Sequence, residues 1–291
     1  MLMKNLRPLL AKTKRILLDM NNSRKLAKIF PKDNIEPIVK YNRQTLKSIP
    51  DWIDDEVYEQ SIFQYGLPRE VKHLINKDIG NNITYSDVIL YLGSFLKKPV
   101  NYLELGVSVG KNFFQVVNYL KKINLTGFDI EEINPVLEKY FHRISRVEWE
   151  TMKNSLKHKN SSITEYLYAL NQNRIKYISG DIFDENSWRR LAGSKYNIIF
   201  SDAFHSPDAL LHEYEMIKKY GLLDEDEFLL VWDDLQGQME NSFNNIWVDL
   251  IQKYNLKEDN KLRLRLSGWL GLNVHEIGIV TKSAKMEVKW Q

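Results

Sequence analysis

The stretch Tyr102–Gly110, which reads YLELGVSVG, decides the fold of this chain. An apolar run leads to Gly106 and Gly110, and a helix is expected to begin near Lys111. Gly106 lets the chain turn with its backbone close to a ligand, and Gly110 opens the helix with bare amide N–H groups. The pattern predicts a strand, a turn and a helix of the kind that binds nucleotides, although it also occurs in purely structural turns.

Short apolar runs alternate with helical stretches from the capping-box pattern of Thr84 and Asp87 onward. This alternation predicts an α/β fold, in which helices cover both faces of a mostly parallel, Rossmann-like, seven-stranded sheet. The last two runs follow each other without a long helix, which predicts an antiparallel edge strand. The predicted strands are Val100–Leu105, Leu125–Asp129, Ile175–Ser179, Tyr196–Ser201, Phe228–Trp232, Leu262–Leu266 and Val274–Thr281.

The chain divides into an extension and a main domain. Residues 1–83 are expected to form a helical N-terminal extension, and residues 84–291 the main domain. Residues 134–173 form a longer segment than the connection between the second and third predicted strands requires. This predicts an insertion of one or more helices. Such an insertion either covers the active site and selects the substrate, or is a structural or dimer-forming addition.

Residues 1–30 carry a strong positive charge. They hold eight Lys or Arg and one acid, a net charge of +7, so residues 31–291 carry −4 of the chain's total of +3. Leucines at helical spacing predict a basic amphipathic helix there. It either makes peripheral contact with an anionic membrane or a partner, or packs on the body or on a second subunit of a homo-oligomer. Pro31 and Pro37 are expected to break the pattern, leaving short helices and loops after them.

The composition excludes several classes of site. The chain has no cysteine, so disulfides, thiolate zinc sites and a cysteine nucleophile are excluded. Together with the lack of a bilayer-spanning apolar run, this predicts a cytoplasmic protein with no transmembrane segment. The mildly acidic body predicts that nucleic acid is not a partner.

Each of the first five predicted strands ends in or runs into an acid. The acids are Glu104, Asp129, Asp181, Asp202 and the pair Asp233–Asp234. Ligands of such sheets bind outside the carboxyl ends of the strands, where these side chains are expected to converge. A lone acid there is usually a helix cap or a solvated turn, but a purely structural sheet has no need of carboxylates in five such places.

The glycine turn resembles the first motif of the class I S-adenosylmethionine (SAM)-dependent methyltransferases. Glu104, Gly106 and Gly110 are in register with the family's acid-x-Gly-x-Gly-x-Gly pattern, and Ser108 stands at its middle glycine. The resemblance implies that both glycines approach the methionine part of SAM and that Glu104 meets its amino group.

Two later positions resemble further motifs of that family. The resemblance implies that Asp129 accepts both ribose hydroxyls of SAM and that Ile130 lies near the adenine. Asp181 would face the adenine amino group, or else it is a loop or cap acid. The resemblance covers roughly residues 84–282.

The acids after the fourth and fifth strands point to a metal. Neighbouring strands would bring Asp202 close to Asp233 and Asp234, and three carboxylates repel one another unless a cation lies among them. A hard cation such as Mg²⁺ suits ligands that are all oxygen. The arrangement is similar to the divalent-metal-dependent O-methyltransferases of the catechol and macrocin types, which implies that these three acids are the metal ligands. The alternative is a loop and a helix cap without metal.

His205 follows Asp202 by three residues and precedes a helix that Ser206 and Pro207 are expected to begin. A neutral imidazole there could take a hydroxyl proton as general base, or it could hydrogen-bond within the loop and shape it.

The leading interpretation is a Mg²⁺-assisted O-methyltransferase. It would transfer the methyl group of SAM to a hydroxyl of a small molecule such as a sugar, a polyketide, a phenol or another secondary metabolite, with Asp202 and His205 as catalytic residues. One alternative is a metal-free methyltransferase of the same fold that acts on nitrogen or on a macromolecule. The other is a non-catalytic SAM-fold binding protein.

Overall fold

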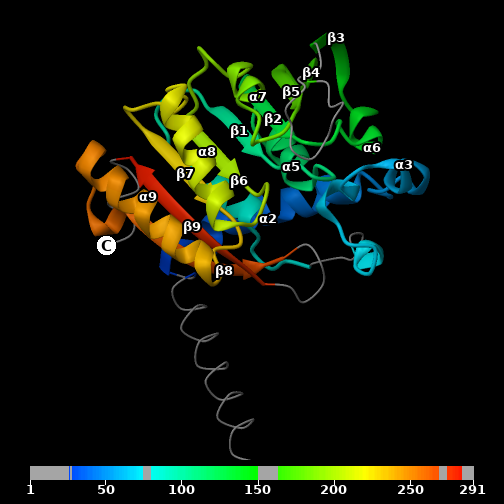
Figure 1. The fold of residues 1–291 in the computed structure, drawn as a ribbon. Coiled ribbons are helices and arrows are strands. Elements are labelled where there is room, and N and C mark those ends of the chain that lie inside the picture. The colour runs from blue at the N-terminus through cyan, green and yellow to red at the C-terminus, as the bar shows by residue number, and fades with distance from the viewer. Residues whose placement is uncertain (1–25, 27, 75–79, 150–162, 269–273, 284–291) are drawn as a thin grey trace, which may run out of the picture.

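The chain folds around one nine-stranded sheet, shown in a computed structural model that describes residues 26, 28–74, 80–149, 163–268 and 274–283 (Figure 1). The strand order is β3-β4-β5-β2-β1-β6-β7-β9-β8. The strands are β1 (Asn101–Leu105), β2 (Asn124–Asp129), β3 (His142–Trp149), β4 (Ile163–Leu170), β5 (Asn173–Ser179), β6 (Ile198–Ser201), β7 (Phe228–Trp232), β8 (Lys261–Ser267) and β9 (Val274–Lys282).

The central strands β5, β2, β1, β6 and β7 are parallel, and β9 pairs antiparallel with both β7 and β8. The predicted Rossmann-like α/β fold and its late antiparallel pair are therefore confirmed, and each of the seven predicted strands lies within two residues of its expected bounds. The predicted total of seven was wrong, because β3 and β4 add a further antiparallel pair beside β5.

The insertion at residues 134–173 was predicted to be helical, and this was wrong for its described residues. It holds one short helix, α6 (Pro135–Glu138), followed by β3 and β4. The physical reason lies in β4, where Tyr166 and Tyr168 are buried at a spacing of two and stack with ring centroids 5.9 Å apart. Alternate burial is the period of a strand, and β-propensity of the aromatic residues supports it.

Helices cover both faces of the sheet (Figure 1). The helices α2, α4 and α5 pack against one another on one side, and α8 packs against α9 on the other. The helix bounds are α2 (Lys32–Lys47), α3 (Asp55–Gln60), α4 (Tyr85–Gly93), α5 (Lys111–Tyr119), α7 (Glu185–Arg189), α8 (Pro207–Lys219) and α9 (Gln238–Tyr254), with short 3₁₀ helices η1 (Gln64–Gly66), η2 (Lys72–Leu74) and η3 (Glu258–Asn260).

The N-terminal extension packs on α4 and α5 through α2. Arg43 makes a buried ion pair of 2.7 Å with Asp87, whose carboxylate also caps α4 in the predicted capping box with Thr84. Pro31 precedes α2 as expected, but Pro37 lies inside the helix and does not interrupt it. Pro37 and Asp33 are exposed, so water can reach the Asp33 carbonyl that proline leaves without a partner.

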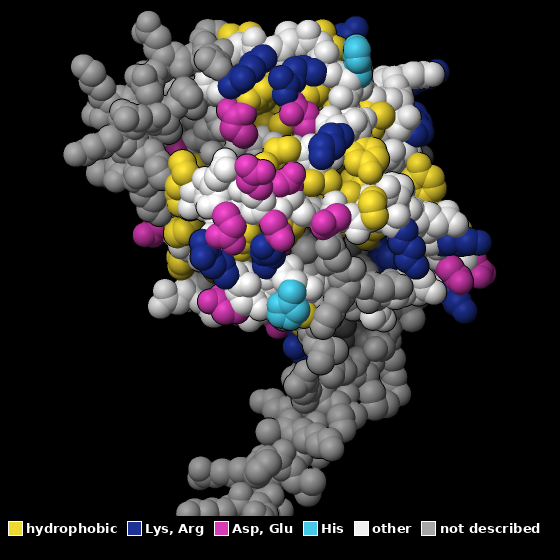
Figure 2. Space-filling view, turned by 90° about the vertical axis from the view of Figure 1, so that its right-hand side faces the viewer, with side chains coloured by type: hydrophobic (Ala, Val, Ile, Leu, Met, Phe, Trp, Pro, Cys, Tyr) yellow, Lys and Arg dark blue, Asp and Glu magenta, His cyan; other side chains and the backbone are white. Residues whose placement is uncertain are grey.

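The basic amphipathic helix predicted for residues 1–30 lies almost entirely outside the described residues. Among the helices that the structure describes, none is long and apolar enough to cross a membrane. On the face shown in Figure 2, Lys and Arg side chains are interspersed with Asp, Glu and apolar side chains and form no single basic field.

Candidate active site

The glycine turn places the ends of β1 and β6 against each other. Gly106 has φ +79°, and a Cβ at this position would overlap the backbone of Asp202 and Ala203, which follow β6. Gly110 has φ +90°, and a Cβ there would overlap the side chain of Leu137. Gly106 is thus required by close packing against backbone as well as by its left-handed conformation, and Gly110 chiefly by its left-handed conformation. The turn brings the expected cofactor loop directly beside the first expected metal ligand.

Glu104 is buried near the carboxyl end of β1 and does not lie on the surface of a cleft. Its side chain is 1% exposed and accepts hydrogen bonds from the Tyr102 hydroxyl (2.6 Å) and the Asn112 amide (2.8 Å). Burial raises the pKa of Glu104 well above its usual value, partly offset by these two hydrogen bonds. An ammonium group that comes within reach would favour the ionised form of this carboxyl.

Asp129, at the end of β2, is tied to the glycine turn by its carboxylate. Oδ2 accepts the backbone N–H groups of Val107 (2.7 Å) and Ser108 (2.8 Å), and Oδ1 accepts that of Glu131 (2.8 Å). Burial raises the pKa of Asp129 to about 6 despite these three bonds. A carboxylate has about four acceptor positions, so there is room on Oδ1 for one more donor.

A cavity of about 400 Å³ lies along this edge of the sheet. Gly106, Ser108, Asp129, Ile130 and Asp181 all line it, as expected for cofactor residues; Glu104 and Gly110 do not line it. Asp181 also closes its own loop, because its Oδ1 accepts the N–H of Phe183 at 2.8 Å. This hydrogen bond is what the alternative interpretation of Asp181, as a loop acid, expects.

The same cavity continues to Asp202 and His205, so one space joins the glycine turn to the end of β6. Its outer wall includes Phe63, Tyr65 and Gly66 from the N-terminal extension. No local sequence pattern predicts this wall, because the contact joins segments some forty residues apart.

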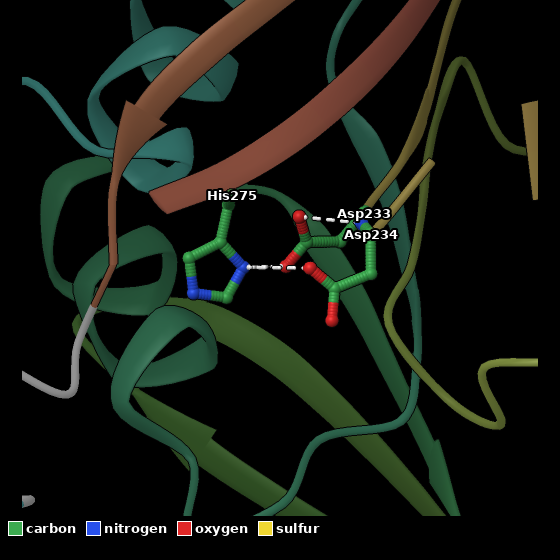
Figure 3. A group of neighbouring side chains, drawn as sticks. All are labelled: Asp233, Asp234 and His275. Atoms are coloured by element: carbon green, nitrogen blue, oxygen red, sulfur yellow. Dashed lines mark hydrogen bonds and ion pairs between the residues drawn. The ribbon is translucent and has the colours of Figure 1, made fainter. Parts of the chain in front are cut away.

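Three carboxylates and two imidazoles meet at the ends of β6, β7 and β9. His205 lies between two acids, with Nε2 2.9 Å from Asp202 Oδ1 and Nδ1 3.1 Å from Asp234 Oδ2. His275 hydrogen-bonds Asp233 through Nδ1, and the same nitrogen lies 3.5 Å from Asp234 Oδ1 (Figure 3). The predicted proximity of Asp202 to the Asp233–Asp234 pair is thus mediated by His205.

His275 was missed by the sequence reasoning. It is the second residue of β9, and β9 runs antiparallel to β7, so it begins at the edge where β7 ends. Asp233, Asp234 and His275 each offer one ligand atom, and these atoms all lie within 4.8 Å of one another. The signal that could have found His275 is its place at the start of a strand already expected to be antiparallel.

The imidazoles and carboxylates shift one another's titration. Burial lowers the pKa of His205, but its hydrogen bond to Asp202 and the charges of the neighbouring acids raise it to about 9 overall. Burial likewise opposes the bond to Asp233 at His275, and the pKa again rises to about 9. Burial and the charge of Asp202 raise the pKa of Asp233 to about 6. Near pH 7 two imidazolium ions therefore offset much of the acids' charge.

Tyr85 contacts two members of this cluster of acids and imidazoles. Its hydroxyl lies 3.4 Å from Asp202 Oδ2, and its ring packs edge-on against His275 with centroids 5.4 Å apart. Tyr85 is the first residue of α4, which the capping box of Thr84 fixes in place. The helix start thus holds both an acid of β6 and the imidazole of β9.

Comparison with known proteins finds similarity in solved structures alone. The chain is similar to CurJ carbon methyltransferase (11% identity, covering 91% of this chain and 71% of that chain, TM-score 0.42), to human methyltransferase-like protein 13 in complex with SAH (13%, 68% and 81%, 0.40) and to an rRNA methylase from Streptococcus thermophilus (10%, 67% and 93%, 0.39). No family model and no curated protein matches the sequence. Similarities this distant carry no substrate or residue role over to this chain.

Proposed function

We propose that this chain is a SAM-dependent O-methyltransferase that acts on a hydroxyl of a small molecule. The observation that supports this most is the single cavity that Gly106 and Asp129 share with Asp202 and His205. A cofactor lying along the glycine turn would present its methyl group toward the acid and imidazole end. An acceptor bound there would be held in line for a direct displacement, which depends chiefly on positioning.

The residues at the cofactor end would bind the polar groups of SAM. Glu104 would pair with the amino group, and Asp129 would accept one ribose hydroxyl at Oδ1 while its other bonds stay with the backbone. Ile130 and Asp181 would border the adenine. The glycines would let the methionine part approach the backbone.

At the other end, a divalent cation such as Mg²⁺ would fit among Asp202, Asp233 and Asp234. The donor chemistry agrees, because three carboxylates gathered at one edge need positive charge, which two imidazoles supply in part. When bound, the metal would lower the pKa of an acceptor hydroxyl. Through its bond to Asp233, His275 would orient this ligand in the manner of an outer-shell partner.

The transfer would form a bond from the acceptor oxygen to the methyl carbon and break the carbon–sulfur bond of SAM. The products would be the methyl ether and S-adenosylhomocysteine (SAH). The proton of the hydroxyl would pass to Nε2 of His205, which first has to lose the proton it carries between Asp202 and Asp234. The charge of a metal cation bound to the neighbouring acids would lower the pKa of His205. The ring would then lose its proton and could act as a base.

A second candidate is transfer without metal. The two imidazoles already pair with the three acids, and this network is nearly charge-balanced as it stands. In that case the acceptor would lie against His205 alone, and nitrogen or a macromolecule would be as suitable as a small hydroxylated molecule. Methyl transfer that is unaffected by EDTA would favour this candidate.

The proposal is tested by transfer of labelled methyl groups from SAM to a panel of hydroxylated small molecules, with and without Mg²⁺. We expect product with at least one acceptor, and its loss in Asp202→Asn. Asp226→Asn, an exposed acid paired with Lys98, is the matched control and should transfer normally. A complete lack of SAM turnover or binding would contradict the proposal.

A further inference from the structure

Residues 61–67 form the outer wall of the cavity at its cofactor end. Phe63, Tyr65 and Gly66 face the same space as Ser108 and Asp129. These wall residues belong to the N-terminal extension and come from a segment that precedes the main domain by about twenty residues. Whatever binds at the glycine turn is therefore enclosed by a segment that is not part of the Rossmann-like unit.

Three hydrogen bonds hold this wall segment in place. The Ser108 hydroxyl donates to the Tyr65 carbonyl at 2.6 Å, and the backbone N–H of Phe63 donates to the Glu131 carboxylate. The Tyr58 hydroxyl donates to the Leu67 carbonyl at 2.7 Å. The first two bonds come from the turns after β1 and β2, so the wall is attached to the cofactor end itself.

The backbone of the wall segment is unfavourable by itself. Gln64 (φ +51°), Tyr65 (φ +52°) and Gly66 (φ +70°) are three successive residues in the left-handed region, and two of them carry side chains. Residues other than glycine adopt this region at an energetic cost and keep it only where the surroundings hold them. The bond from Ser108 is made to the carbonyl in the middle of this turn.

Ser108 is also in the left-handed region, with φ +55°. A glycine at this position, as in the family motif, would not bear that cost, so the contacts of the serine have to offset it. Its hydroxyl is bonded to the wall segment, and its N–H donates to Asp129. The departure from the motif therefore has a physical explanation in the structure.

A small apolar cluster supports the same attachment. Tyr65 and Tyr58 pack with Ile53 and with Val109, the residue after Ser108, and Leu67 packs against them. The cluster is separate from the two main hydrophobic cores.

We propose that Ser108 is a positioning residue, whose hydroxyl fixes residues 61–67 as the wall that retains the cofactor. The identity of that cofactor rests on the function proposed above, but the attachment of the wall does not. The competing interpretation is that Ser108 is simply a small residue tolerated in place of glycine.

Ser108→Gly separates the two interpretations, because it relieves the backbone cost and removes the hydroxyl together. Hydrogen–deuterium exchange on the full chain would report the wall, and stopped-flow dissociation of SAH would report retention. We expect exchange of amides in residues 61–67 and SAH dissociation each to rise about fivefold, the factor for one net hydrogen bond, with no fall in melting temperature. Ser108→Ala should show the same two changes with lower stability.

Lys122→Gly is the matched control, since Lys122 is an exposed left-handed residue (φ +59°) in the turn before β2, at the opposite edge of the sheet. This substitution should change neither the amide exchange of residues 61–67 nor the dissociation rate of SAH. Unchanged exchange in residues 61–67 of Ser108→Gly would overturn the proposal. Faster exchange with unchanged SAH dissociation would overturn the role in retention. If the wild-type chain binds no SAH, the proposed function fails, while the exchange measurement still decides the attachment.

Discussion

The two ends of the cavity neutralise their carboxylates in different ways. At the cofactor end, Asp129 is bonded to three backbone N–H groups and Glu104 to a phenol and an amide. At the other end, Asp202, Asp233 and Asp234 are paired with imidazoles. Backbone and amide donors are permanent parts of the fold, whereas a proton on an imidazole can be exchanged for another cation or lost.

This difference indicates that the two ends of the cavity have different roles. The cofactor end is a pre-formed binding surface whose hydrogen-bond donors are fixed by the fold. The acid end can change its charge during a reaction, which is what proton transfer and metal binding require. Changes at the acid end should therefore affect transfer, and changes at the cofactor end should affect binding.

The largest expected effect is at the acid end. Asp202→Asn keeps the size of the side chain but removes the charge that faces His205 Nε2. We expect methyl transfer to fall about a thousandfold, within the range for loss of positioned acid–base chemistry, while SAH affinity changes little. Steady-state rates and calorimetric SAH binding would measure the two. An equal loss of SAH affinity would show that the two ends of the cavity do not have separate roles in transfer and in binding.

The next effect is at the glycine turn. Gly106→Ala places a Cβ on the backbone of Asp202 in a left-handed residue, and we expect SAH affinity to fall about a hundredfold. Gly193→Ala has a similar φ of +81° with nothing within 4 Å of the added Cβ, so it isolates the backbone cost from the overlap. Binding measured for both variants should differ widely; equal losses would refute the close packing of β1 on β6.

A smaller change is expected at His275. Replacing it with Gln removes the imidazole that holds Asp233, and we expect affinity for a divalent ion to fall about tenfold, as for other outer-shell partners. SAH affinity should stay constant because His275 does not line the cofactor cavity. Titration of Mn²⁺ followed by paramagnetic resonance would measure this. Unchanged ion binding would remove His275 from the metal proposal.

The smallest effect concerns pH. Burial raises the pKa of Asp129 to about 6, so this carboxyl is ionised at pH 7.5 and mainly protonated at pH 5. The ionised form accepts a ribose hydroxyl better, so SAH affinity should rise with pH and level off above 6, by about tenfold or less. Calorimetry across this range would detect it. The same slope in Asp129→Asn would assign the pH dependence to another group.

The sequence predicted what local patterns encode. Apolar runs and the glycines of Tyr102–Gly110 were sufficient to place seven strands and to bring Gly106, Asp129 and Asp202 to one edge. It could not reveal His275, whose position depends on the direction in which β9 pairs. The antiparallel pair of β3 and β4 was missed because the spacing of two between Tyr166 and Tyr168 was not recognised as the period of a strand.

The wall formed by Phe63 and Tyr65 was beyond sequence reasoning for another reason. It depends on one serine hydroxyl reaching a carbonyl 43 positions earlier in the chain, and such a contact has no periodicity. The chemical roles of the predicted cofactor and metal residues remain predictions.

The central claim is that the glycine turn binds SAM, and calorimetric titration of SAM into EDTA-treated protein tests it most directly. We expect one saturable site with a Kd on the order of micromolar, weakened in Gly106→Ala, and a separate Mg²⁺ isotherm that Asp233→Ala abolishes. A SAM isotherm without any Mg²⁺ response would leave the cofactor site standing and favour metal-free transfer. No saturable SAM binding would contradict the claim.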